Sequence, residues 1–121
     1  MTLINVDKNH THISDMIAPE KLLSGGGATS LWNAFSDKSE QFHVGLWSSE
    51  PCALKVSYDE NELCVITQGE VKITDNEGHV FQYTRGDAFV IPAGFKGVWE
   101  SVTPVTKIYA VFEQEKPNDE T

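Results

Sequence analysis

From Phe42 onward, short apolar runs alternate with short polar turns along the chain. The runs are rich in Val, Ile, Tyr, Phe and Trp, which favour strands, and the stretches between them contain the Gly, Pro, Asp and Asn typical of turns. About eight strands at short, regular spacing, with no helical period between them, predict an all-β sandwich or barrel. The predicted strands are FHVGLW, ALKVSY, LCVITQ, EVKITD, HVFQYT, DAFVIP, GVWESV and TKIYAVF.

One predicted hairpin can be described in more detail. The segments EVKIT and HVFQY both alternate polar and apolar residues, so one face of each strand is expected to be buried and the other exposed. The residues Asp75-Asn76-Glu77-Gly78 connect them, and Gly78 can adopt the positive φ that such a loop needs. We interpret this hairpin as scaffold.

Residues 1–41 lack a clear period. The segment APEKLLSGGG predicts either a short helical turn or an extended arm, and without a strand expected before it we interpret Gly25-Gly26-Gly27 as a linker. The sequence therefore divides into an N-terminal arm over 1–41, packing on the barrel or on a partner subunit, a barrel over 42–112, and an acidic tail over 113–121. We expect the tail to be a solvated end.

The formal charge of the 121-residue chain is −9, which argues against nucleic acid or an anionic membrane surface as its partner. No apolar run has the length of a membrane helix, and the N-terminus does not resemble a signal peptide, so a cytoplasmic protein is expected. Cys52 and Cys64 are then expected to be free thiols.

Two motif spacings bear on the type of barrel. A glutamate, six residues and a glycine form Glu62–Gly69, and a glycine, five residues, proline, one residue and glycine form Gly86–Gly94. With a hairpin between them, these segments resemble the two motifs of the cupin superfamily. The segments GLWSSEPC, YDENELCVITQGEV, GDAFVIPAGFKGVWE and TKIYAVFE resemble the small cupins of the (S)-ureidoglycine aminohydrolase branch. The resemblance implies a small antiparallel jelly-roll barrel, commonly a homodimer, with a ligand site inside the barrel mouth.

The same resemblance implies a metal held by three histidines and the motif glutamate, a ligand set that suits Mn, Fe, Ni or Zn. In this sequence the paired-histidine positions correspond to Lys55 and Ser57, or to Val56 and Tyr58 with a loop one residue shorter. The third corresponds to Gly97, so only Glu62 is retained. The standard metal site cannot be assembled from these residues. We therefore predict no metal and no other cofactor, and leave a divalent ion in an irregular site open.

The four histidines of the sequence are poor substitutes for the missing metal ligands. His10 and His12 have the His-x-His spacing but no glutamate and glycine at the matching distance, and His79 is expected to be exposed beside the hairpin turn. His43 opens a strand and could face the barrel interior, where it could also take part in an irregular metal site with Glu62.

Strand alternation identifies the remaining candidates. If Gly97 faces inward, Trp99 and Ser101 do too, and Cys64 shares the face of Glu62. A buried Glu62 needs a cationic partner, for which Lys55, Lys96 and Lys107 are candidates. The predicted pocket residues are Tyr58, Glu62, Cys64, Trp99, Trp47, Lys55, Lys96, Lys107 and His43. Two functions follow: metal-independent binding of a small molecule, which we prefer, or an enzyme acting on a small nitrogenous or carbonyl substrate with Glu62 as acid or base. A barrel that only mediates assembly is a third possibility.

Overall fold

The computed structural model describes residues 1–114, which form an all-β structure. No helix long and apolar enough to cross a membrane occurs in this part of the chain. The strands are β1 (His12–Met16), β2 (Leu22–Gly25), β3 (Ala28–Ser36), β4 (Phe42–Ser49), β5 (Cys52–Ser57), β6 (Asn61–Gln68), β7 (Glu70–Asp75), β8 (Val80–Thr84), β9 (Ala88–Ile91), β10 (Lys96–Ser101) and β11 (Val105–Phe112).

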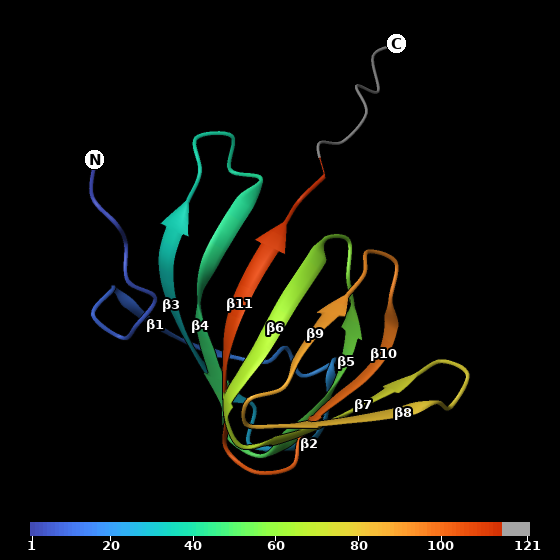
Figure 1. Ribbon diagram of the computed structural model, residues 1–121. Coiled ribbons are helices and arrows are strands. Elements are labelled where there is room, and N and C mark those ends of the chain that lie inside the picture. The colour runs from blue at the N-terminus through green and yellow to red at the C-terminus, as the bar shows by residue number, and fades with distance from the viewer. Residues whose placement is uncertain (115–121) are drawn as a thin grey trace.

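These strands form two antiparallel sheets that face each other (Figure 1). One sheet has the order β1-β3-β4-β11-β6-β9, and the other has the order β2-β5-β10-β7-β8. All eight strands predicted between residues 42 and 112 are present, and the order is consistent with a jelly roll. The all-β prediction is confirmed.

The hairpin between β7 and β8 extends away from the body of the barrel (Figure 1). Gly78 has a φ of 89°, as its place in the connecting loop predicts. The carboxylate of Asp75 accepts hydrogen bonds from the backbone amides of Glu77 and His79, both at 2.9 Å, which fixes the turn. Local turn chemistry therefore explains this hairpin without any functional role.

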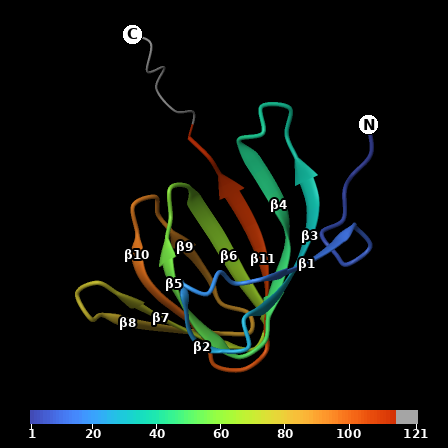
Figure 2. The ribbon, with the colours of Figure 1, turned by 180° about the vertical axis from the view of Figure 1, so that it is seen from behind.

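The first 41 residues contain three strands (Figure 2). Strand β3 pairs with β4, β1 pairs with β3, and β2 pairs with β5, so the segment contributes to both sheets. The residues Ala18–Leu22 form a single turn in which the amides of Lys21 and Leu22 bond to the carbonyl of Ala18. A strand therefore does precede the glycines. The expectation that no strand precedes them was wrong, and β2 escaped prediction because it is only four residues long and has no alternating pattern, but Gly26 and Gly27 do connect β2 to β3.

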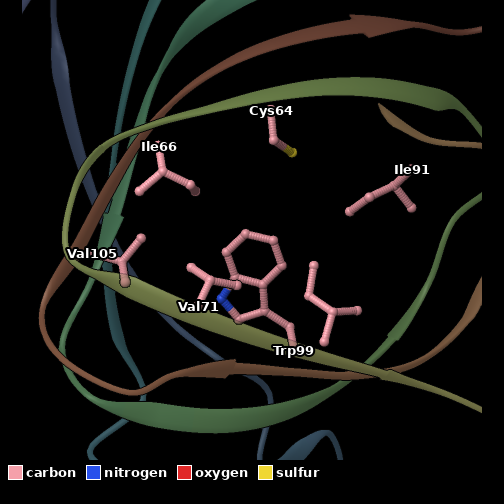
Figure 3. Packing of buried hydrophobic residues seen from close by; sticks show 7 residues of the cluster. Cys64, Ile66, Val71, Ile91, Trp99 and Val105 are labelled. Atoms are coloured by element: carbon pink, nitrogen blue, oxygen red, sulfur yellow. The ribbon is translucent and has the colours of Figure 1, made fainter. Parts of the chain in front are cut away.

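An apolar core fills one end of the barrel. Trp99, from β10, is 2% exposed, and its indole projects between the sheets toward Cys64 on β6 (Figure 3). Cys64 and Ser101 are also buried, as the strand alternation predicts. The other buried members of the core cluster are Ile66, Val71, Ile73, Ile91 and Val105.

Candidate functional site

A cavity of about 540 Å³ lies between the two sheets, beside the core. It is at the end of the barrel where β5 and β11 end and β4 and β6 begin (Figure 1). Its volume is in the range typical of small-molecule sites. Apolar and polar side chains line it together: Leu31, Asn33, His43, Trp47, Leu54, Val56, Tyr58, Glu60, Glu62, Trp99, Lys107, Tyr109, Val111 and Glu113.

An ion pair forms the floor of this cavity. The Lys107 ammonium on β11 donates to Oε2 of Glu62 on β6 at 2.6 Å, and the two residues are 6% and 7% exposed. The Cys64 thiol donates to the same oxygen at 3.0 Å. Burial raises the pKa of Cys64 to about 12, so the thiol stays protonated at neutral pH. Although burial opposes its charge, the groups around Lys107, Glu62 among them, raise its pKa above the usual value. The floor therefore holds a charged lysine.

Two indoles enclose the rest of the Lys107 ammonium. Its Nζ lies 4.4 Å from the ring centroid of Trp99 and 4.9 Å from that of Trp47. The indoles pack edge to face, with centroids 5.7 Å apart and an interplanar angle of 87°. Cation–π attraction is strongest where water is excluded. The lysine is thus held by one carboxylate and two aromatic rings, an arrangement that we call the lysine cage (Glu62, Lys107, Trp47 and Trp99).

Tyr58 lines the cavity near its opening and is held through its backbone. Its carbonyl accepts from the amide of Gly94 at 2.7 Å, and its amide donates to the carbonyl of Phe95 at 3.0 Å. Burial raises the pKa of Tyr58 to about 12, although Lys107 opposes this shift. The hydroxyl is therefore neutral at neutral pH, and it makes no hydrogen bond to any side chain or backbone group of residues 1–114. It is free to contact a ligand.

Carboxylates mark the rim of the cavity. Glu60, in the loop between β5 and β6, and Glu113, after β11, both line it. Burial raises the pKa of Glu60, and the negative charges of Glu113, Glu62 and Asp59 add to this effect. The rim is therefore electronegative.

A chain of hydrogen bonds fixes the wall opposite. The Tyr109 hydroxyl donates to Asn33 Oδ1 at 2.6 Å, and Asn33 Nδ2 donates to Ser36 Oγ at 2.9 Å. Ser36 Oγ lies 2.7 Å from His43 Nδ1, and His43 Nε2 lies 2.9 Å from the carbonyl of Glu40. Because a carbonyl can only accept, Nε2 carries a proton and donates to the carbonyl of Glu40. Both ring nitrogens of His43 are thus engaged, which removes it as a metal ligand in this arrangement.

The residues around Glu62 do not fit the metal implied by the resemblance. Val56 and Tyr58 line the cavity whereas Lys55 and Ser57 are exposed, so the two paired-histidine positions carry a valine and a phenol. A Cβ at position 97 would collide with the Thr74 carbonyl oxygen, so this strand has no room for a side chain there. Within residues 1–114 no group of three or more His, Cys, Asp or Glu side chains could hold a metal ion.

The structure brings six of the nine predicted pocket residues to the cavity wall: Tyr58, Glu62, Trp99, Trp47, Lys107 and His43. Cys64 does not line the cavity but contacts Glu62. Lys55 and Lys96 are outside it and exposed. Lys55 points away from the interior because its neighbours Leu54 and Val56 point inward.

Several lining residues were not predicted. Tyr109 and Asn33 come from strands far apart in the sequence, and their hydrogen bond spans 76 residues. Glu60 lies in a predicted turn with three acidic residues, a composition typical of a solvated loop, and Glu113 was placed in the acidic tail. Most of that tail, residues 115–121, lies outside the described residues. The sequence signal that was available for the rim was the cluster Asp59–Glu62 directly before the motif strand.

Comparison with known proteins identifies the family. The EutQ-like cupin domain matches residues 36–109. The chain belongs to the EutQ-like cupin family. A search of curated proteins gave no match.

Solved structures share the fold of this cupin. A protein of unknown function of the DUF861 family from Pseudomonas syringae pv. tomato has a TM-score of 0.74 at 22% identity, over 88% of this chain and 46% of its own. The Clostridium difficile EutQ protein has a TM-score of 0.62 at 16% identity, over 70% and 62%. A DUF861 family protein from Thermotoga maritima has a TM-score of 0.54 at 33% identity, over 55% and 76%. The chain thus spans about half of the Pseudomonas protein.

Proposed function

We propose that this cupin binds a small organic molecule in its mouth cavity through its own side chains, without a metal. The observation that carries the proposal is the lysine cage: the ammonium of Lys107 occupies the Glu62 carboxylate that the cupin motif would offer to a metal. The cavity beside it is open to a ligand, since Trp99 packs against the core without filling the mouth. Tyr58 supplies at its wall a hydroxyl that has no hydrogen-bond partner among residues 1–114.

We also propose that the chain derives from the (S)-ureidoglycine aminohydrolase branch while lacking that branch's metal ligands. The sequences of the motif segments and their flanks support the branch. Val56, Tyr58 and Gly97, which stand at the histidine positions, argue against the metal-dependent activity. Catalysis by Glu62 is the weaker alternative. Its Oε2 already accepts from Lys107 and Cys64, so acid or base chemistry would fall to Oε1 alone.

Binding can be tested by NMR on untagged protein with a library of small fragments. The indole N–H signals of Trp47 and Trp99 should shift when a fragment binds, while Trp32, which stacks on His12 on the first sheet, serves as an internal control. The variant Val56→Phe should reduce binding by filling the cavity. The same change at exposed Val90 on β9 is the matched control.

The metal-free part of the proposal needs elemental analysis of the same sample. We expect far less than one Mn, Fe, Ni or Zn per chain. A near-stoichiometric content that falls in a Glu62→Gln variant would overturn it. If no fragment in the library shifts Trp47 or Trp99, the binding proposal fails.

A homodimer is the assembly that the resemblance to small cupins implies, and we retain it as a proposal. Strand β1 is exposed along its whole length and carries Ile13 and Met16 on the edge of a sheet, a surface that a second copy could cover. Light scattering should give twice the chain mass of 13.4 kDa, and a monomer would contradict the proposal.

A further inference from the structure

Building on the proposed binding function, we propose that the ligand is a small organic cation: a protonated amine that carries an apolar body. Carboxylates and phosphates are excluded by the same features. The inference rests on three parts of the cavity, namely its floor, its rim and its walls.

The floor presents an acceptor. Both hydrogen bonds to the Glu62 carboxylate go to Oε2, and within residues 1–114 Oε1 has no hydrogen-bond partner. The Glu62 side chain is more than nine-tenths buried and lines the cavity, so Oε1 can be satisfied only by something in the cavity. A carboxylate oxygen accepts and does not donate, so a ligand that displaces water from Oε1 must bring an N–H or O–H group to replace it. Charged donors form the stronger bonds.

The one lysine of the floor does not attract anions. Lys107 already contacts Glu62 and Cys64, and the Trp47 and Trp99 rings lie over its ammonium. A ligand carboxylate would have to displace a buried partner that is 2.6 Å away. The floor therefore acts on a ligand as a neutral pair with one free acceptor.

The carboxylates at the rim favour a ligand that carries a positive charge. Glu60 and Glu113 add two carboxylates to that of Glu62. The lining then holds three carboxylates against one ammonium and one imidazole, so it is net negative whether or not the imidazole carries a charge. Low-dielectric walls concentrate such a field and raise the local concentration of ions of the opposite sign. The rim favours cations over neutral molecules and repels anions.

The walls determine the remainder of the ligand. Leu31, Leu54, Val56 and Val111 line the cavity together with the edges of the aromatic rings. This surface suits a hydrocarbon or aromatic body, and the Tyr58 hydroxyl provides one further polar contact. Burial of the apolar body adds affinity that a bare ammonium ion would lack.

The experiment compares benzylamine, benzyl alcohol and benzoate, which have nearly the same shape and are positive, neutral and negative at pH 7. Binding is followed by calorimetry and by the Trp47 and Trp99 indole signals. We expect benzylamine to bind at least about tenfold more tightly than benzyl alcohol, as a charge-assisted bond to Oε1 and the rim field predict, and benzoate to bind most weakly. Added salt should weaken benzylamine binding and leave benzyl alcohol binding unchanged.

The variants Glu60→Gln and Glu113→Gln should each weaken benzylamine about two- to fivefold, the effect of a partly exposed charge, without changing benzyl alcohol binding. The matched control is Glu77→Gln, at the tip of the β7–β8 hairpin, where the side chain is 82% exposed. Equal or tighter binding of benzyl alcohol or benzoate would overturn the cation proposal and leave the binding proposal standing. If neither this series nor the fragment library binds, both proposals fail.

Discussion

Replacing Lys107 by methionine should cost this cupin a large part of its stability. The change keeps an unbranched side chain that is one heavy atom shorter, but removes the ammonium that lies over Trp47 and Trp99 and that Glu62 needs at 2.6 Å. Breaking a buried ion pair by removing one partner typically costs about 3–5 kcal/mol, because the other charge is left uncompensated. Oε1 of Glu62 lies beside an open cavity that water can enter, so we expect the lower end, about 3 kcal/mol.

The partner change, Glu62→Met, should cost a similar amount, since it leaves a buried ammonium. The double variant should be close to the wild type, because an apolar pair of similar volume often replaces a buried ion pair without loss. The coupling free energy between the two positions is then at least about 3 kcal/mol. Urea unfolding followed by circular dichroism measures all four proteins.

The control for this cycle is Lys96→Met, the same change at an exposed lysine of β10, which should shift stability by less than about 0.5 kcal/mol. The reasoning is refuted if Lys107→Met is as harmless as Lys96→Met. It is equally refuted if the losses of the two single variants simply add in the double variant, because independent sites do not form a cage.

Three further predictions concern Gly97 on β10, the buried thiol of Cys64 and the carboxylate of Glu60 at the cavity rim. Gly97→Ala should lower the free energy of unfolding in urea by about 2 kcal/mol or more, because the new Cβ meets the Thr74 carbonyl oxygen. The control Gly26→Ala lies in open space and should leave stability unchanged. Equal stabilities of the two variants would contradict this prediction. The Cys64 thiol has a pKa of about 12 in the folded state and of about 9 in the unfolded state. Between these pH values the unfolded state loses the thiol proton and the folded state keeps it, so the free energy of unfolding falls as the pH rises from about 9 to about 12. Cys64→Ala should make this decline shallower by up to about 1.4 kcal/mol per pH unit, and an unchanged slope would exclude the thiol as its source. Benzylamine affinity should fall as the pH is lowered into the acid range, because burial and the charges of Glu113, Glu62 and Asp59 raise the pKa of Glu60, which therefore protonates before an exposed glutamate does. Glu60→Gln should flatten the calorimetric pH profile, and a profile that it leaves unchanged would contradict the assignment.

The barrel strands could be predicted because their information is local. Each has its own apolar alternation, and each turn its own glycine, proline or aspartate. The turn of Gly86 and Asp87 is an example: the Asp87 carboxylate accepts from the Thr84 amide at 2.8 Å, as the residue types predict. The strands before residue 42 lacked such signals. All five residues of β1 are exposed, so no buried face leaves a pattern in the sequence.

The candidate site was predictable only in part, because its contacts are not local. The motif identified Glu62, and alternation placed Trp99 and Cys64 inside. Three lysines were equally good partners for Glu62 on sequence grounds. Only the antiparallel pairing of β11 with β6 brings Lys107 next to it, across 45 residues. The hydrogen bond between Tyr109 and Asn33 also depends on strand pairing and not on local sequence. Gly45 lies between the two residues in the sheet, and its lack of a side chain leaves room for the bond.

The cupin motif of this chain thus has a structural role beside a cavity whose lining lacks the three motif histidines. The Pro92-Ala93-Gly94 turn bonds to the Tyr58 backbone and so fixes a wall of the cavity. A histidine reintroduced at position 97 would not restore a metal centre, because the Thr74 carbonyl blocks its Cβ. Even with that strand moved, Lys107 would still occupy Glu62 Oε2, and an ammonium within 2.6 Å would repel a divalent cation. Gly97, which leaves no room for an imidazole, and Lys107, which pairs with Glu62, are therefore two parts of one arrangement. In it the positive charge beside Glu62 comes from a lysine of the chain.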